Sequence, residues 1–179
     1  GCFVPAISCD EAIHCEWPHE IMGPTDNRMW NQWWAYDNIR NVNELIQNLS
    51  SSTLFAEARR TELLAEAHAI RAWYYFGMVK RYGGVPIIKS PQVYDPNNLE
   101  ALLVSRNTEE ESYNFILEDL NYAIENLPNT RAANEKYRIN RFSAAALKTR
   151  AMLFAASIAK YGTYDLSLIH ISEPTRRTP

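Results

Sequence analysis

The strongest constraint on the fold is an apolar repeat of helical spacing between residues 113 and 127. Apolar side chains recur at i, i+3, i+4, i+7, i+10, i+11 and i+14, which places them on one face of an α-helix. Thr108 and Glu111 form a capping-box sequence before the repeat, and Pro128 ends it. Such a helix must bury this face against other elements. The repeat consists of Tyr113, Ile116, Leu117, Leu120, Ala123, Ile124 and Leu127.

Three further segments have helical patterns. One spans about residues 28–48, and another spans about 53–81 and ends at Gly83 and Gly84. Residues 72–79 are apolar on nearly all sides, so we expect this helix to be the centre of the core. The last segment, 141–161, is rich in alanine, which permits close helix packing. The expected buried faces are Ile39, Val42, Ile46 and Leu49 in the first segment, and Phe142, Ala145, Ala146, Thr149, Met152, Leu153 and Ala156 in the last.

Composition favours the same fold class. The 179 residues include 20 alanines but only six valines and six glycines, which is untypical of a β-sandwich or barrel. We therefore predict an all-α fold with four main helices in antiparallel pairs. Residues 85–96 contain three prolines and are expected to form an extended connector between two of these helices. The net charge of −3 argues against nucleic acid as a partner, and no apolar run is long enough to span a membrane.

The chain divides into three expected segments. Residues 1–27 read as a loop-rich segment, residues 28–165 as a partial helical-repeat domain, and residues 166–179 as a non-native tail. The tail resembles translated sequencing-adapter read-through, although a native strand is the alternative. Gly1 and Cys2 would also fit the end of a bacterial lipobox, but no apolar run precedes them, so we expect a mature form or a fragment.

Potential metal ligands gather near the start of the chain. Cys9, His14, Cys15 and His19 lie close in sequence, but their spacing fits no structural zinc pattern, so we predict no metal site. Cys9 and Cys15 could form a disulfide in an oxidising compartment, and the sequence alone does not pair them.

The sequence carries no motif for catalysis or for a cofactor. Glycine-rich phosphate loops and the GxSxG nucleophile motif are missing. Glu57, Glu62 and Glu66 follow one predicted helix, where their spacing favours ion pairs with Arg59 and Arg71 over an acid–base pair. We therefore predict that the protein is not an enzyme and binds no cofactor.

An aromatic-rich segment is the best candidate for ligand binding. Residues 17–36 contain four of the five tryptophans, interleaved with asparagine, aspartate and arginine. Tryptophan rings pack on the C–H faces of sugars, and the polar side chains can bond the hydroxyl groups. We expect Trp33 and Trp34 to begin the core instead, because they lead into the buried stripe of the first helix. The predicted ligand-binding residues are Trp17, Asn27, Arg28 and Trp30.

Four blocks in order resemble the RagB/SusD family of nutrient-uptake outer-membrane lipoproteins. They are WNQWWAYDNIRNVN at residues 30–43, AEAHAIRAWYYF at 65–76 with YGGVP at 82–86, and the helices at 106–128 and 141–150. His68 departs from the pattern, since the family more often has a large apolar residue or arginine there. The block at 65–86 is the most specific of the four.

This resemblance implies tetratricopeptide-like helix pairs that form an incomplete part of a larger α-rich domain. It also implies a lipid-anchored protein on the cell surface, at the outer membrane, that holds an oligosaccharide or other nutrient for a TonB-dependent transporter. The alternative is a helical-repeat scaffold that binds only protein. We expect Arg71 and Glu66 to join helix to helix. The signature residues expected to be structural are Asn43, Glu66, Arg71, Tyr75, Gly83, Gly84 and Pro86.

Overall fold

The computed structural model describes residues 33–162, which fold into helices and loops with no strand among them. The four α-helices are α2 (Tyr36–Ser51), α3 (Glu57–Tyr82), α4 (Glu109–Asn126) and α5 (Arg141–Tyr161). Short 3₁₀ helices, η4 (Leu99–Leu102) and η5 (Ala133–Glu135), lie in the two longer connections. The predicted all-α class is confirmed.

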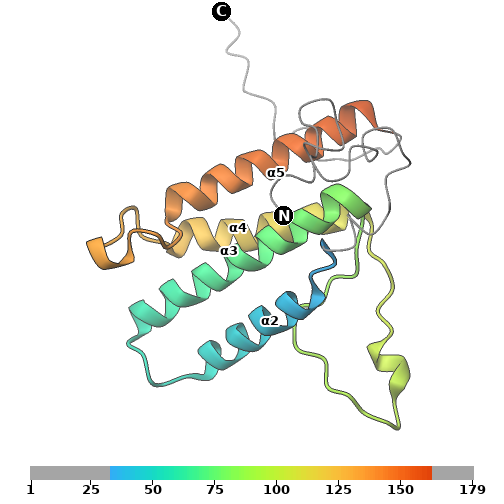
Figure 1. Ribbon diagram of the computed structural model, residues 1–179, viewed down its shortest axis with the longest axis horizontal. Helices are drawn as coiled ribbons and strands as arrows, with labels where there is room; N and C mark the ends of the chain where they lie inside the picture. Colours follow the sequence, from blue (N-terminus) through green and yellow to red (C-terminus); the bar gives the residue numbers. More distant parts are fainter. Residues whose placement is uncertain (1–32, 163–179) are drawn as a thin grey trace, which may run out of the picture. The chain divides into compact units, whose positions relative to one another are not determined.

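Successive helices run antiparallel, and all four belong to one compact unit that begins at Ala35 (Figure 1). α3 lies in the middle and contacts each of the other three, while α4 also packs on α5. The central position follows from its sequence, because Tyr75, Met78 and Val79 are all fully buried near its C-terminal end. No helix within residues 33–162 is long and apolar enough to cross a membrane.

The sequence pattern of α4 predicts its structure well. Thr108 accepts a hydrogen bond from the Glu111 amide, and the Glu111 carboxylate accepts one from the Thr108 amide, so the capping box is formed. Tyr113, Ile116 and Leu120 from the predicted repeat are fully buried.

The starts of α2 and α3 differ from the prediction. α2 begins at Tyr36, so the described residues Trp33, Trp34 and Ala35 lie outside it. Trp34 is 52% exposed, which makes its assignment to the core wrong, while Trp33 is half-buried. α3 begins at Glu57, because the Ser52 hydroxyl accepts a hydrogen bond from the Leu54 amide and holds a turn before the helix.

The predicted buried face of α5 is only partly correct: Met152 is buried, Ala145 and Ala156 are half-buried, and the other four residues are exposed. The helix buries Ala144, Ala151 and Ala155, whereas Phe142 and Leu153 are 64% and 58% exposed. Small alanine side chains let α5 pack closely on its neighbours, and Met152 is buried beside them. The predicted face also contained alanines, so the error is its position around the helix: Ala144 and Ala155 are buried, each one residue before the predicted Ala145 and Ala156. The expected domain boundaries at 27/28 and 165/166 lie outside the described residues.

Candidate functional site

The four predicted ligand-binding residues, Trp17, Asn27, Arg28 and Trp30, lie outside the described residues. The same holds for Cys9, His14, Cys15 and His19. The described residues contain three other features that bear on function: a buried polar cluster, an extended connector fixed by side chains, and two surface hollows beside that connector.

Arg71 is the centre of the buried polar cluster. Its Nε and Nη2 donate to the two carboxylate oxygens of Asp119 on α4, at 2.8 and 2.7 Å. Its Nη1 donates to the Asn43 side-chain oxygen on α2 at 2.8 Å. One arginine on α3 therefore joins α2, α3 and α4. The expected pairing of Arg71 with a glutamate of its own helix is wrong, because its partner is Asp119 on α4. The apolar repeat that predicted α4 does not include Asp119.

His68 contributes to the same cluster. Its Nδ1 lies 2.7 Å from the Asp119 Oδ1. Because an ionised carboxylate can only accept, Nδ1 carries the hydrogen and donates a hydrogen bond to Asp119. The imidazole ring also packs against Tyr122, with ring centroids 4.5 Å apart. Burial alone would raise the pKa of Asp119, but the hydrogen bonds and charges of Arg71 and His68 outweigh it and hold that pKa below its ordinary value. Asp119 is therefore kept ionised.

Glu66 is the second buried carboxylate, and it also pairs with arginines. Arg131 Nη2 donates to its Oε1 at 2.6 Å, and Arg138 Nε donates to the same oxygen at 3.0 Å. Both arginines come from the connection between α4 and α5, which Glu66 thus holds against α3. The predicted pair of Arg59 with Glu62 is also present, at 2.9 Å.

The connector after α3 is extended, as its prolines predict, and side chains from α2 and α3 hold its backbone. Asn43 Nδ2 donates to the Ile88 carbonyl at 2.8 Å, and the Ile88 amide donates to the Tyr75 hydroxyl at 2.8 Å. The Tyr36 hydroxyl donates to the Pro86 carbonyl at 2.7 Å. Burial raises the pKa of Tyr75 to about 12, so its hydroxyl stays protonated.

The two glycines of the signature permit the turn into this connector. Gly83 has a φ of 71°, the left-handed side of the map that favours glycine, and it caps α3. A Cβ on Gly84 would overlap the Asn107 carbonyl oxygen and lie 2.7 Å from the Thr108 carbonyl carbon. Glycine at this position therefore lets the end of α3 approach the start of α4.

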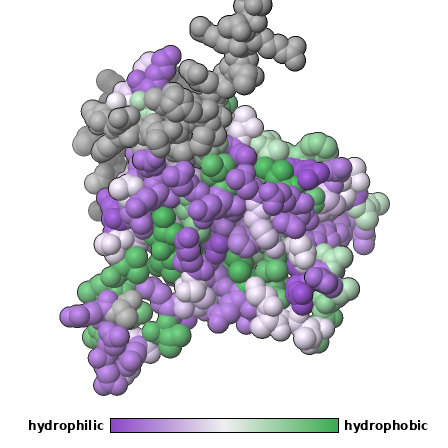
Figure 2. All heavy atoms as spheres, turned by 180° about the vertical axis from the view of Figure 1, so that it is seen from behind, coloured by the Kyte–Doolittle hydropathy of each residue, from purple (hydrophilic) through white to green (hydrophobic). Residues whose placement is uncertain are grey.

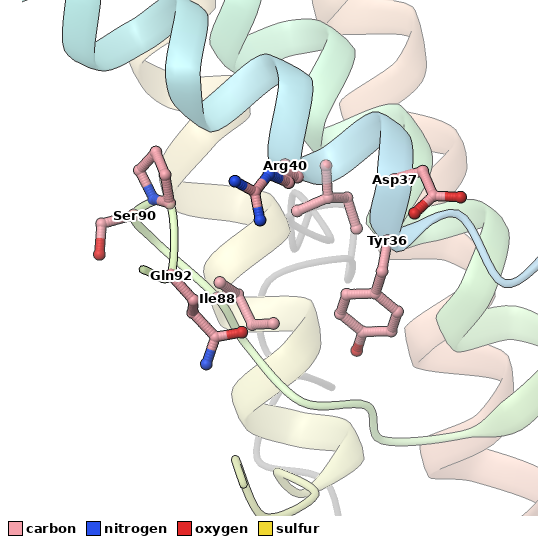
Figure 3. Close-up of a pocket in the computed structure, with 8 residues that line it drawn as sticks. Tyr36, Asp37, Arg40, Ile88, Ser90 and Gln92 are labelled. Carbon is pink, nitrogen blue, oxygen red and sulfur yellow. The ribbon is translucent and has the colours of Figure 1, made fainter. Parts of the chain in front are cut away.

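A hollow of about 180 Å³ lies between the N-terminal half of α2 and the connector (Figure 3). Ile39 and Ile88 supply apolar surface, while the Arg40 guanidinium and the Gln92 amide supply polar groups at its edge. The hollow therefore combines apolar surface with hydrogen-bonding side chains. Sequence reasoning missed Arg40 and Gln92, because the two are brought together only by the path of the connector. The lining residues are Tyr36, Asp37, Ile39, Arg40, Ile88, Ser90, Pro91 and Gln92.

A wider hollow of about 450 Å³ lies on the other side of the connector, along α4. Lys89 is one of its lining residues, and its ammonium lies 5.2 Å from the Phe115 ring centroid and 3.8 Å from a Glu118 carboxylate oxygen. Asn114 and Glu111 complete its polar lining.

Known proteins share both the sequence and the fold of this chain. The model of a SusD-like family, described as "Starch-binding associating with outer membrane", matches residues 8–153. A SusD-like protein of Bacteroides ovatus is 30% identical over 132 residues, covering 73% of this chain and 23% of that protein. The chain spans between 21% and 25% of the length of the curated relatives it matches.

Two solved structures extend this comparison. A SusD-like protein from Bacteroides fragilis is 34% identical with a TM-score of 0.64, over 80% of this chain and 28% of that one. A laminarin-binding SusD-like protein is 26% identical with a TM-score of 0.60, over 80% of this chain and 32% of that one. The family match covers most of this chain, and the helices of the relatives superpose on its own. The chain belongs to the SusD/RagB family.

Proposed function

We propose that this chain is part of a cell-surface, lipid-anchored protein that binds an oligosaccharide for import through a TonB-dependent outer-membrane transporter. The observation that carries the proposal is the match of residues 8–153 to a family described as starch-binding and associated with the outer membrane. A similar solved structure is described as a laminarin-binding SusD-like protein, which supports a carbohydrate ligand. The role is binding rather than catalysis.

The state of the buried carboxylates supports a binding role. A general acid needs a carboxyl group with a raised pKa that faces a cleft. Asp119 instead has a lowered pKa and two bonds to Arg71, and Glu66 is held by Arg131 and Arg138. Asp119 joins α4 to α3, and Glu66 joins α3 to the connection between α4 and α5.

The proposed ligand residues are Trp17 and Trp30, which would stack on sugar rings, with Asn27 and Arg28 bonding hydroxyl groups. The segment that contains them leads directly into α2 in sequence, and α2 carries the hollow at Tyr36 and Arg40. Independently of that segment, we assign the hollow a role of its own, in which Arg40 and Gln92 bond hydroxyl groups of a glycan.

Affinity electrophoresis tests the proposal. The protein is run through native gels that contain starch, laminarin or other soluble polysaccharides. We expect at least one glycan to retard it, and we expect Trp17→Ala and Trp30→Ala to remove the retardation. Tyr137→Ala is the matched control, because Tyr137 is 91% exposed on the connection between α4 and α5. Equal mobility in every gel would contradict glycan binding and favour the alternative of a protein-binding scaffold.

A further inference from the structure

A closed ring of six charged side chains joins α3 to the connection between α4 and α5. Positive and negative charges alternate around this charge ring, so each arginine lies between two glutamates. Three members lie on one face of α3, at i, i+3 and i+7, and the other three lie in the connection. In order around the ring, the members are Arg59, Glu62, Arg131, Glu66, Arg138 and Glu135.

Arg131 is the most buried member of the charge ring. Its Nη2 donates to Glu66 Oε1 at 2.6 Å, and its Nη1 donates to Glu62. Its Nε also donates to the Ile139 carbonyl at 2.9 Å, which folds the connection back on itself. Hydrophilic residues cover much of the surface seen from behind (Figure 2), and isolated ion pairs between exposed charges contribute little to stability. Arg131 differs from them because only 3% of its side chain is exposed, so breaking its pairs is costly.

Glu135 and Arg59 close the ring on its more exposed side. Arg59 Nη2 donates to Glu135 Oε1 at 2.5 Å, and its Nη1 donates to Glu62 Oε2 at 2.9 Å. Arg138 lies 3.0 Å from Glu66 and 3.7 Å from Glu135. The hydrogen bond from Arg59 holds the pKa of Glu135 below its ordinary value, so this carboxylate is charged at neutral pH.

Side chains rather than backbone groups attach the connection to α3. Within residues 33–162, no backbone group of residues 129–138 is hydrogen-bonded to α3. The backbone bonds of the connection are local turns, from the Glu135 amide to the Ala132 carbonyl and from the Arg138 amide to the Glu135 carbonyl. Ile139 packs on an apolar cluster that is made mostly of alanine and therefore buries little apolar area. The buried members of that cluster are Ala65, Ala69, Ala123, Leu127 and Ala144.

We propose that residues 127–140 form a strap that opens and closes on α3 as one unit, held closed by the charge ring, while the four helices stay folded. Opening breaks the four links between α3 and the strap together, because the pair of Arg59 with Glu62 stays on α3 and the pair of Glu135 with Arg138 stays in the strap. Linked charges of this kind reinforce one another. Segments with few buried apolar contacts are the ones that open locally in native proteins. The proposal does not depend on glycan binding.

Hydrogen–deuterium exchange of the full chain, followed by mass spectrometry, tests the proposal. Glu66→Gln keeps the shape of the side chain but removes the charge that Arg131 and Arg138 share. We expect peptides from the strap to exchange at least tenfold faster, with unchanged exchange in α2 and α4. Glu44→Gln is the matched control, because Glu44 forms an exposed pair with Arg40 on α2, and it should change nothing in the strap. Equally faster exchange in all helices, or unchanged exchange in the strap, would overturn the proposal.

A second substitution tests whether the charge ring acts as a unit. Arg59 and Glu66 share no hydrogen-bond partner, so independent pairs would give effects on strap exchange that multiply in the double variant. We expect Arg59→Gln alone to speed exchange of the strap at least tenfold, and the double variant to exchange little faster than the faster single variant. Effects that multiply would overturn the ring as a unit. If Glu66→Gln does not fold, Arg59→Gln decides alone: faster exchange confined to the strap supports the proposal, and unchanged exchange there overturns it.

Discussion

Arg71 and Asp119 face one another across the contact between α3 and α4, joined by two hydrogen bonds of 2.8 and 2.7 Å and almost completely buried. The same guanidinium reaches Asn43 on α2, so this pair holds three helices in register. A buried charge that loses its partner is costly, which makes this pair the point at which the fold is most sensitive to substitution.

We predict that Asp119→Ala lowers the free energy of unfolding by about 3–5 kcal/mol, because Arg71 is left buried without its counter-charge. The matched control is Glu118→Ala, the neighbouring residue in sequence, whose contact with Lys89 is long and exposed. That substitution should change stability little. Urea unfolding followed by circular dichroism measures both, and similar losses for the two variants would contradict the assigned role of Asp119.

Two buried tyrosines should respond in opposite ways to the loss of their hydroxyl group. The Tyr75 hydroxyl accepts from the Ile88 amide at 2.8 Å, so Tyr75→Phe leaves that amide without its partner and should cost about 1–3 kcal/mol. The Tyr113 hydroxyl is buried with no hydrogen-bond partner among the described residues, so Tyr113→Phe should be neutral or stabilising. Thermal unfolding of the two variants side by side checks this order, and the reverse order would refute it.

We predict different losses of stability for alanine substitutions at Gly83 and at Gly84. Gly84→Ala forces a Cβ against the backbone at Asn107 and Thr108, where nothing flexible can move aside. Gly83→Ala meets no atom within 4 Å, so its cost is limited to the strain of a φ of 71°, about 1–3 kcal/mol. We expect the melting temperature to fall further for Gly84→Ala than for Gly83→Ala. Equal shifts would contradict this order, because the overlap at Gly84 would then cost no more than the backbone strain at Gly83.

Acid should weaken the fold through Asp119. Its folded-state pKa lies below the ordinary value of 3.8, so its ion pair contributes fully at pH values above that and is lost as the pH falls through the folded-state pKa. We predict that this contribution to the free energy of unfolding is constant between about pH 7 and pH 5 and declines below about pH 4. Asp119→Asn should show a shallower decline in the acid range. Parallel curves for the two proteins would show that other carboxyl groups cause the acid sensitivity.

Sequence periodicity predicted the helices well, and it failed where small or polar residues decide the packing. The apolar repeat and capping box located α4 closely, and Gly83 marked the end of α3. The buried face of α5 was predicted at the wrong position around the helix, because Ala144 and Ala155 are buried while Phe142 and Leu153 are exposed. Hydrophobic spacing also cannot predict that a charged residue such as Asp119 is buried.

The functional features depend even more on tertiary structure. Arg40 and Gln92 lie 52 positions apart in sequence and meet only because the connector is bound back against α2. The exposed apolar side chains of the connection between α3 and α4, such as Val93 and Leu103, could not be told from core residues by composition, since the same residue types fill the core.

The measurement that tests the central claim most directly is a calorimetric titration of the protein with oligosaccharides of the glycan that retards it. We predict that the unsubstituted protein binds saturably and that Trp17→Ala and Trp30→Ala each lower the affinity about tenfold or more. Tyr137→Ala should leave the affinity unchanged. Absence of binding heat across the tested glycans, confirmed by unchanged mobility in affinity gels, would contradict the claim that this chain takes part in glycan capture.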